Sequence, residues 1–359
     1  MIYRQVIRSV RRFIPTFREA RRKVFSIASG LSFSIVALTS AQAFTVNPVT
    51  NPVAVTLPAG ATADEVQKAL DSLPASGGEV VLPAGKIEIT EPIVLNRDFE
   101  ALRGAGEKTI LFLADNANCP VIIMGEPVNH PRRVSHLRVS DLFIDGNRTH
   151  QQRELWRLEG EGSEIRNNGI TVQNVSDSVV EHVTAAHCRS GGLVTTLGTR
   201  RLTVDDLNSY DNEYDGLACF STEDCFFTKL YLHNNPGAGI SLDGNFNHNI
   251  VDGAILAAND LGIFMRWSSD NQFRDISICS SRDFGVFMAE NLDEAVRNLA
   301  RETECTNNSF TNFIADQCGG AAFRINDATC TNNILIDAQF TGDDHGKFSF
   351  VRPNLLLVK

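Results

Sequence analysis

The chain has 359 residues, 43% of them hydrophobic and 21% charged, and this composition excludes intrinsic disorder. Its 26 Gly and 22 Phe residues, with frequent Asn in the second half, favour many short strands joined by tight turns over a helix bundle. The formal net charge is −10 although residues 1–43 are basic, so the remaining chain is strongly acidic. Such a surface repels polyphosphate, and we therefore expect no nucleic-acid partner.

Residues 1–43 have the pattern of a secretory signal peptide. A basic stretch precedes an apolar run over residues 24–38, and Ala41-Gln42-Ala43 supplies the small residues of a cleavage site. The alternative is an uncleaved membrane anchor, which the many serines of the run disfavour. The sequence predicts a monomeric protein, secreted or periplasmic, with residues 44–359 as one domain and no membrane segment after cleavage.

The first part of the predicted domain combines one helix with short strands. Residues 63–73 have an amphipathic helical pattern, and the apolar runs at residues 77–89, 92–95, 102–106 and 109–111 follow it. We expect this helix to cap the N-terminal end of the fold that the strands build.

A glycine followed by an alternating apolar strand recurs through the rest of the chain. The glycines follow one another in steps of 23 or 24 residues, with a last step of 35: Gly169, Gly192, Gly216, Gly239, Gly262, Gly285 and Gly320. This period fits one coil of a β-helix, and it is too short for a propeller blade or a paired-helix repeat. The sequence predicts an all-β fold, a right-handed parallel β-helix with coils over about residues 165–345 and a loop insertion at 291–304.

Positions within the repeat separate the interior from the surface. Because strand side chains alternate, the first and third residues after each glycine face inward, whereas the second and fourth face outward. Asn271, Asn308 and Asn333 fall at one equivalent turn position, where stacked amides can bond from coil to coil. Ordinary turn composition is the alternative for each asparagine alone, and their shared register favours a ladder.

Two of the eight cysteines occupy the same position of consecutive coils. Cys305 and Cys330 each lie three residues before a ladder asparagine, which brings their Cα atoms one strand spacing apart. In an oxidising compartment this register predicts a disulfide, with two free thiols as the alternative. The pairing of Cys119, Cys188, Cys219 and Cys225 stays unassigned.

The capping helix, the apolar strands and the glycine repeat together resemble the pectate-lyase-like superfamily of secreted β-helices, over roughly residues 60–345. The resemblance implies the fold and a carbohydrate-active protein with a polysaccharide partner. It does not imply one reaction, because this fold hosts lyases, hydrolases, epimerases and phage adhesins.

We expect a substrate groove on the outward positions of the glycine-led strands. Asp243 and Arg266 come one coil apart, and aromatic rings beside them suit sugar binding. The catalytic candidates are Asp243, Arg266 and Asp215; the substrate-binding candidates are Phe264, Phe287, Arg324, Phe220, Tyr214, His187 and His233. The alternative is that Asp243 and Arg266 form a cross-strand ion pair and that the phenylalanines pack under a loop.

The sequence predicts a polysaccharide lyase or a related enzyme that acts on an acidic polysaccharide, and other chemistries fit this set as alternatives. Residues 212–216 and 237–241 resemble two polygalacturonase motifs, but Ala238 replaces a histidine of the motif and the paired aspartates between the motifs are absent. A lyase would use Arg266 as base, with a Ca²⁺ ion bound by Asp215 or Asp243, and an epimerase could use the same groups. A hydrolase would use Asp215 and Asp243 as its two carboxylates. A non-catalytic glycan-binding module remains the third alternative.

Overall fold

The computed structural model describes residues 53–156, 165–290, 303–341, 348–350 and 355–358. The predicted signal peptide and most of the predicted insertion lie outside these residues. Residues Phe44–Lys359 form one structural unit.

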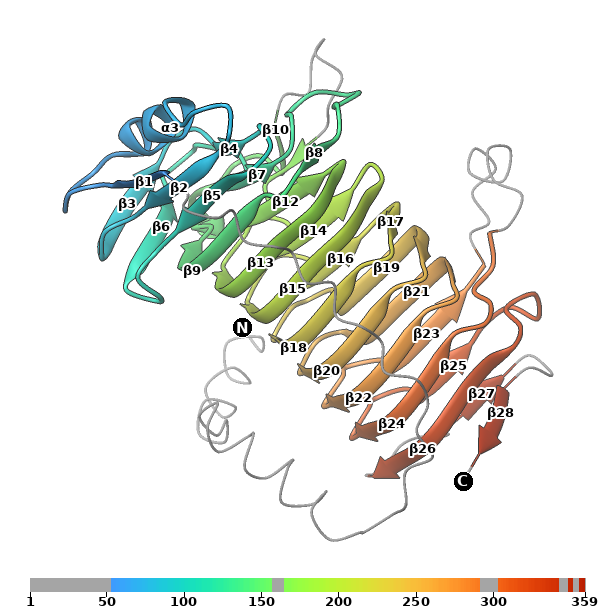
Figure 1. Ribbon diagram of the computed structural model, residues 1–359. Helices are drawn as coiled ribbons and strands as arrows, with labels where there is room; N and C mark the ends of the chain where they lie inside the picture. Colours follow the sequence, from blue (N-terminus) through green and yellow to red (C-terminus); the bar gives the residue numbers. More distant parts are fainter. Residues whose placement is uncertain (1–52, 157–164, 291–302, 342–347, 351–354, 359) are drawn as a thin grey trace, which may run out of the picture. The chain divides into compact units, whose positions relative to one another are not determined.

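Helix α3 (Ala63–Asp71) lies at the N-terminal end of the strands, as predicted (Figure 1). A capping box begins the helix: the hydroxyl of Thr62 accepts a bond from the backbone N–H of Glu65, and the Glu65 carboxylate accepts one from the N–H of Thr62. The buried face of α3, with Val66 and Leu70, packs against β2, β3 and β4. This helix covers apolar ends that the first coil would expose.

The N-terminal strands are short and pair in parallel, with one exception. They are β1 (Val53–Thr56), β2 (Gly78–Val81), β3 (Gly85–Ile89), β4 (Ile93–Leu95), β5 (Glu100–Arg103), β6 (Thr109–Leu113), β7 (Ile122–Met124), β8 (Val134–Ser135), β9 (Arg138–Asp145), β10 (Leu155–Trp156) and β11 (Ile165–Arg166), with a 3₁₀ turn at Arg148–His150. The exception is the antiparallel hairpin of β10 and β11.

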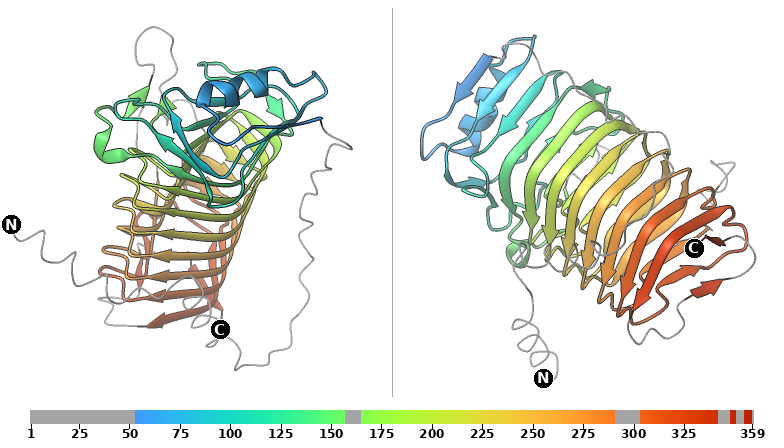
Figure 2. Two further views of the ribbon diagram at one scale, coloured as in Figure 1. Left: turned by 90° about the vertical axis from the view of Figure 1, so that its left-hand side faces the viewer. Right: turned by 60° about the horizontal axis from the view of Figure 1, so that its bottom comes forward.

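From β12 onward the chain stacks regular coils, all of them paired in parallel (Figures 1 and 2). Their strands are β12 (Ile170–Gln173), β13 (Val175–Ala186), β14 (Leu193–Thr196), β15 (Thr199–Tyr210), β16 (Leu217–Cys219), β17 (Thr222–Glu223), β18 (Phe226–His233), β19 (Ala238–Asn247), β20 (Ile250–Ala257), β21 (Leu261–Ser269), β22 (Gln272–Cys279), β23 (Val286–Ala289), β24 (Ser309–Asp316), β25 (Phe323–Ile325), β26 (Asn333–Thr341), β27 (Phe348–Phe350) and β28 (Leu355–Val358). Equivalent positions are 22 to 24 residues apart in most coils. The predicted parallel β-helix and its period are confirmed.

Each regular coil has three faces. Face A carries the glycine-led strands β12, β14, β16, β21, β23 and β25 and the first half of β19; faces B and C carry the first and second halves of the strands that follow. The strand of face B continues into face C through one residue in the left-handed conformation, such as Asp206 (φ 57°) or Asp275 (φ 52°). The sequence analysis did not distinguish face C as a separate strand, because a single residue makes this bend and only one coil has a glycine there, Gly253.

The interior is apolar and closely stacked. The predicted inward positions, among them Ile170, Leu193 and Met265, are fully buried. Glycine starts face A because neighbouring coils approach too closely there for a side chain: a Cβ on Gly239 would lie 3.0 Å from the carbonyl oxygen of Gly262. The repeated glycine is therefore a packing requirement of the stack.

Two ladders of buried asparagines join the coils. The predicted ladder is present: the amide of Asn271 donates to Asn308 over 2.9 Å, and that of Asn308 donates to Asn333 over 2.9 Å. Asn249 extends it by one coil. A second ladder, Asn212–Asn235–Asn259, lies before face A and was not predicted. Both ladders satisfy backbone groups that the turns would leave buried and unpaired.

The predicted register of the last coil is wrong by two residues. Val286 pairs with Phe323, and Phe287 pairs with Arg324, so the coil step is 37 residues and not 35. The run Gly319-Gly320-Ala321-Ala322 offers several small residues for the position that glycine holds elsewhere, and Ala322 takes it. Arg324 therefore lies beside Phe287 and not in the column of Arg266.

The predicted pair Cys305 and Cys330 is buried, and the backbone N–H of Cys305 lies 3.5 Å from Sγ of Cys330. The structure contains both as free cysteines, so the bridge is not formed in it. The disulfide stays a prediction. We expect a non-reducing peptide map of the exported protein to recover the two joined, because their register allows a bridge that would stabilise by about 3 kcal/mol. Recovery of both as alkylatable thiols would contradict it.

Candidate functional site

Face A carries the predicted candidates in two outward columns. One runs through Ser241, Phe264 and Phe287 to Arg324, and the other through Phe220, Asp243 and Arg266. Parallel pairing in register places each side chain about one strand spacing, roughly 4.8 Å, from its neighbour in the column. Face A therefore presents rows of like positions along the coil stack, which suits a long ligand.

Asp243 and Arg266 form the cross-coil ion pair that the sequence left as the alternative. The guanidinium bonds both carboxylate oxygens, with Nε 3.2 Å from Oδ1. The pair is part-buried on β19 and β21, at the point where the pairing register shifts after Asp243. This bidentate contact fixes the guanidinium plane of Arg266 relative to the Asp243 carboxylate.

Asp215 lies immediately before β16 and is mostly buried. Its Oδ1 accepts a bond of 2.7 Å from the backbone N–H of Ala238 in the next coil. Burial raises the pKa of Asp215 to about 6, and the neighbouring Asp243 carboxylate adds to the rise, whereas the Ala238 bond and Arg166 oppose it. The site therefore contains two carboxyl groups in different environments: Asp215 is buried with a raised pKa, and Asp243 is paired with Arg266.

The hairpin of β10 and β11 contributes charged groups beside Asp215. Arg166 forms an ion pair with Glu154, and its guanidinium lies 5.8 Å from the ring centroid of Tyr214. The hydroxyl of Tyr214 donates to Glu154 over 3.2 Å. Tyr214, a predicted binding residue, is thereby fixed at the edge of face A with 43% of its surface exposed.

Aromatic rings and guanidinium groups alternate on the C-terminal part of face A. Phe264 and Phe287 stack with centroids 5.9 Å apart and planes 3° apart. Arg266 lies 5.3 Å from the Phe264 centroid, and Arg324 lies 5.5 Å from that of Phe284. The structure brings these predicted residues together and adds Phe284, which the sequence analysis missed because it precedes the strand.

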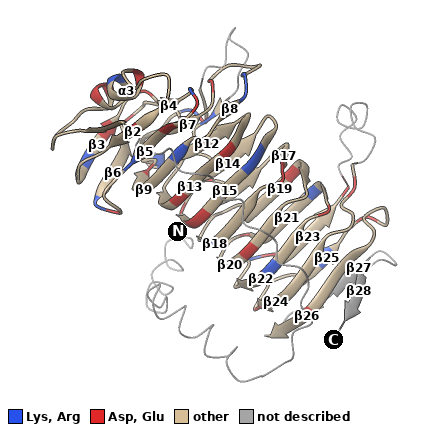
Figure 3. Cartoon of the chain, in the orientation of Figure 1, with Lys and Arg blue, Asp and Glu red and all other residues tan. Residues whose placement is uncertain are grey.

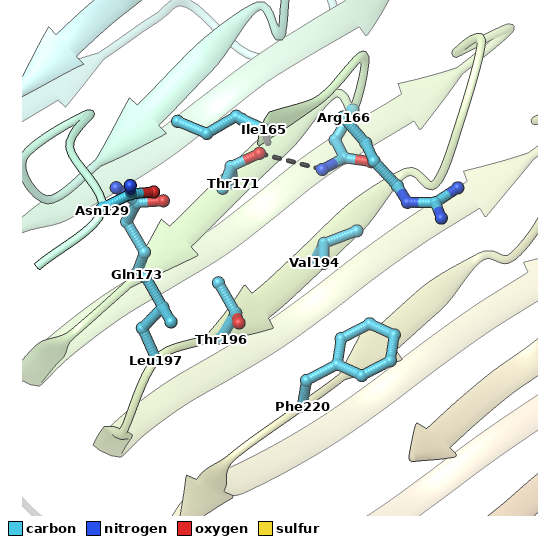
Figure 4. A pocket seen from close by; sticks show the side chains of 10 residues that line it. Asn129, Ile165, Arg166, Thr171, Gln173, Val194, Thr196, Leu197 and Phe220 are labelled. Carbon is cyan, nitrogen blue, oxygen red and sulfur yellow. Dashed lines mark hydrogen bonds between the residues drawn. The ribbon is translucent and has the colours of Figure 1, made fainter. Parts of the chain in front are cut away.

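A pocket opens on the N-terminal part of face A (Figure 4). Its volume is about 230 Å³, and β12, β14 and Phe220 form its floor. The lining residues are Asn129, Ile165, Arg166, Asn168, Thr171, Gln173, Val194, Thr196, Leu197 and Phe220. Only Phe220 was predicted as a site residue. The outward positions of the repeat include Thr171, Gln173, Val194 and Thr196, but these uncharged side chains did not indicate a binding site in the sequence.

His187 and His233 lie away from this site, contrary to the prediction that they border face A. They flank Tyr210 where face C ends: His187 meets it edge-on at 5.8 Å, and His233 stacks on it at 4.8 Å. The bond with Asp145 raises the pKa of His187, whereas burial lowers that of His233 to about 4.

Charged side chains elsewhere on the coils pair across neighbouring strands. Figure 3 shows acidic and basic segments side by side on adjacent coils. Examples are Asp177 with Arg201 and Asp205 with Lys229, whose Nζ lies 2.8 Å from Oδ1. Most such pairs are part-exposed and contribute little stability each.

Among the described residues, no group of three or more His, Cys, Asp or Glu lies close enough together to hold a metal ion. Soft transition-metal ions prefer imidazole and sulfur ligands, and here Met265 and Met288 are fully buried in the interior. The part of the chain that the structure describes does not fit a site for such an ion. A Ca²⁺ ion on Asp215 or Asp243 stays a prediction.

The fold places the protein among the pectate-lyase-like right-handed parallel β-helices. A family model described as "Periplasmic copper-binding protein (NosD)" matches residues 142–348, more than half of the sequence, and the chain belongs to this family. The periplasmic family agrees with the predicted export. No helix of the described residues is long and apolar enough to span a membrane. No curated protein matches the sequence.

Solved structures resemble the chain at low sequence identity. A Geobacillus virus E2 protein, ORF18, has a TM-score of 0.63 at 13% identity; the match covers 82% of this chain but only 56% of the viral one. An alginate lyase from a Paenibacillus species has a TM-score of 0.58 at 11% identity, covering 82% and 97%. An endo-xylogalacturonan hydrolase from Aspergillus tubingensis has 0.53 at 14%, covering 85% and 91%. At such identities the likeness establishes the fold alone.

Proposed function

We propose that the protein binds an acidic polysaccharide along face A and hydrolyses it. The observation that carries the proposal is Asp215, whose buried carboxyl group has a raised pKa and which lies near the Asp243 carboxylate of face A. Glycoside hydrolysis requires two carboxyl groups, one of which acts as an acid with a raised pKa.

The surroundings of the carboxylates suit a sugar chain. Phe264 and Phe287 offer a stacked aromatic surface to the apolar faces of sugar rings. Arg266 and Arg324 lie along the same rows and can pair with uronate carboxylates. Because the protein has an excess of acidic residues, these local cations are needed to offset repulsion of an acidic polymer.

In the proposed reaction Asp215 is the general acid. Its protonated form donates to the glycosidic oxygen as the bond breaks, and Asp243 receives the proton of the attacking water. The ion pair with Arg266 fixes the position of the Asp243 carboxylate for this role.

Elimination from a uronate is the second candidate. Arg266 and Arg324 favour it, because a cation beside the substrate carboxylate is what that reaction needs. The ion pair engages Arg266, the expected base of elimination, as well as Asp243, the expected base of hydrolysis, so this contact does not separate the two candidates. The resemblance in fold to an alginate lyase supports elimination, and the resemblance to a xylogalacturonan hydrolase supports hydrolysis. The products of the reaction must therefore distinguish the two candidates.

The experiment is incubation of the purified protein with pectin, alginate, ulvan and fructan. Hydrolysis predicts new reducing ends from an acidic polymer, without the ultraviolet absorbance of unsaturated products, and no reaction with neutral fructan. Formation of unsaturated products would show that the reaction is elimination and not hydrolysis. Binding of an acidic polymer without either product would show a binding module, and absence of both binding and products would overturn the proposal.

Paired variants locate the site. We expect Asp243→Ala/Arg266→Ala to lower activity or polymer affinity at least about 100-fold, because it removes both charges from face A. The control is Asp205→Ala/Lys229→Ala, which removes an equivalent cross-coil ion pair from another part of the coil stack. Both double variants should keep the melting temperature within a few degrees. Equal loss in the two would show a structural effect and place the site elsewhere.

A further inference from the structure

Face A changes from covered to open along the coil stack. In one outward column Gln173 is 2% exposed, Thr196 in the next coil is part-exposed, and Phe220 after it is 37% exposed. The other column is buried from Ile123 on β7 to Ser241, and it becomes part-exposed at Phe264. An outward residue with no exposed surface must have other parts of the chain over it. A polymer lying on the open coils therefore cannot continue past β12 toward β7.

The pocket lies where the face becomes covered. Asn129, from the segment after β7, contributes to one side, and Ile165 and Arg166 of the hairpin contribute to another (Figure 4). The segment is fixed in place, because Asn174 donates to the carbonyl of Pro131 over 2.6 Å and Arg133 to that of Gly198 over 2.8 Å. On the other side of Phe220 the columns continue to Asp243 and Arg266.

The chemistry of the pocket suits one sugar ring held by its hydroxyl groups. The lining offers an amide group from Asn129 and a hydroxyl group from Thr196, with Val194 and Phe220 for the apolar face of a ring. Its one charged lining residue, Arg166, is engaged by Glu154. At about 230 Å³ the pocket is smaller than the roughly 300–1,000 Å³ of pockets for drug-sized ligands, so one ring fits and several do not.

We propose that this pocket is a terminal subsite, which takes the last sugar ring of a polysaccharide and makes the protein recognise chain ends. The inference rests on the proposed function, because it assumes that a polysaccharide lies on face A. It adds that the chain enters from the C-terminal coils and stops at β12. Asp215 and Asp243 then lie a short way from a chain end, so cleavage would release small products of uniform length.

Chain-end recognition is tested by binding. The probes are alginate and polygalacturonate, each intact and as a fraction shortened about tenfold, compared at equal mass. End binding predicts that the midpoint concentration by mass falls about tenfold with the shortened fraction, because that fraction holds tenfold more ends. Binding along the chain predicts equal or weaker binding of the shortened fraction, and this result would overturn the inference.

A matched pair of variants tests the pocket itself. Thr196→Trp fills the pocket from its floor, whereas Thr203→Trp places the same side chain at an outward position of face B in the same coil. We expect Thr196→Trp to weaken binding of the shortened fraction at least tenfold and to remove the preference for it. Thr203→Trp should bind like the unmodified protein, and circular dichroism melts should show both variants folded.

The outcomes separate this inference from the proposed function. If the unmodified protein binds neither polymer in either form, the proposed function fails. If it binds both forms of a polymer equally by mass and Thr196→Trp changes nothing, face A binds polysaccharide but the pocket is not a terminal subsite.

Discussion

Asp215→Asn is expected to lower the rate of polysaccharide hydrolysis about 10³-fold while leaving the affinity for the polymer within about twofold. Proton transfer by a positioned side chain contributes roughly 10²–10⁴ in rate, and the amide cannot supply the proton. Asparagine keeps the oxygen that accepts the Ala238 N–H bond, so the turn before β16 should remain intact. The measurement is reducing-end release with separate polymer binding.

The raised pKa of Asp215 also predicts how the activity should change with pH. The pKa of Asp215 is raised to about 6, so its acid form is present below that value and is lost as the pH rises through it. Activity that depends on the acid form should therefore decline above pH 6. Because the native pKa exceeds the ordinary value, the stability that Asp215 contributes is also full below about pH 4 and is lost as the pH rises to about 6. Asp215→Asn should lack this loss of stability.

A control on the same coil is Asp211→Asn. Asp211 has a left-handed backbone (φ 52°) that asparagine tolerates, and it lies at the corner where face C ends. This variant should keep both the activity and its pH profile. Full activity of Asp215→Asn, or an unchanged pH profile, would remove Asp215 from the proposed chemistry.

Asn308→Ala is expected to destabilise the β-helix by about 3–5 kcal/mol. The side chain is fully buried and bonds on both sides: it accepts from Asn271, and it donates to Asn333 and to the carbonyl of Ser268, each over 2.9 Å. Alanine leaves several of these buried groups unpaired, at about 1–3 kcal/mol each. Chemical denaturation of the variant and the unmodified protein measures the difference.

The control for the ladder is Thr311→Ala, at an outward position three residues further along the same coil. Surface substitutions of this kind change stability by about 0.5 kcal/mol or less. If Asn308→Ala loses less than about 1 kcal/mol, the ladder does not hold the coils together, and backbone pairing alone carries the stack.

Some features follow from local pattern, and these were predicted correctly. Helix α3 has its capping box and amphipathic face within a dozen residues. The 23-residue repeat reflects the close approach of neighbouring coils, which requires a small residue at the same position of each coil. The asparagine ladder through Asn271 and Asn308 follows in the same way, because one position repeats from coil to coil.

The wrong predictions concern positions where the repeated sequence allows more than one register or where its pattern was not recognised. Several small residues before Phe323 could each occupy the glycine position, and only backbone pairing selected Ala322 and moved Arg324 beside Phe287. Face C was not distinguished, because its bend needs only one left-handed residue; Asp, Asn or Gly occupies this position in most coils, but Lys229 (φ 53°) and His182 (φ 51°) interrupt the pattern.

The sequence by itself determined the coil, its period, its inward columns and the outward rows that contain Asp243, Arg266 and the phenylalanines, because these depend on spacing along one strand. Only the tertiary structure decided that Asp243 and Arg266 are paired, that burial raises the pKa of Asp215, and that a pocket lies at one end of face A. These properties arise from side chains and segments far apart in the sequence, such as Asn129 and the β10–β11 hairpin, whose approach no local pattern encodes.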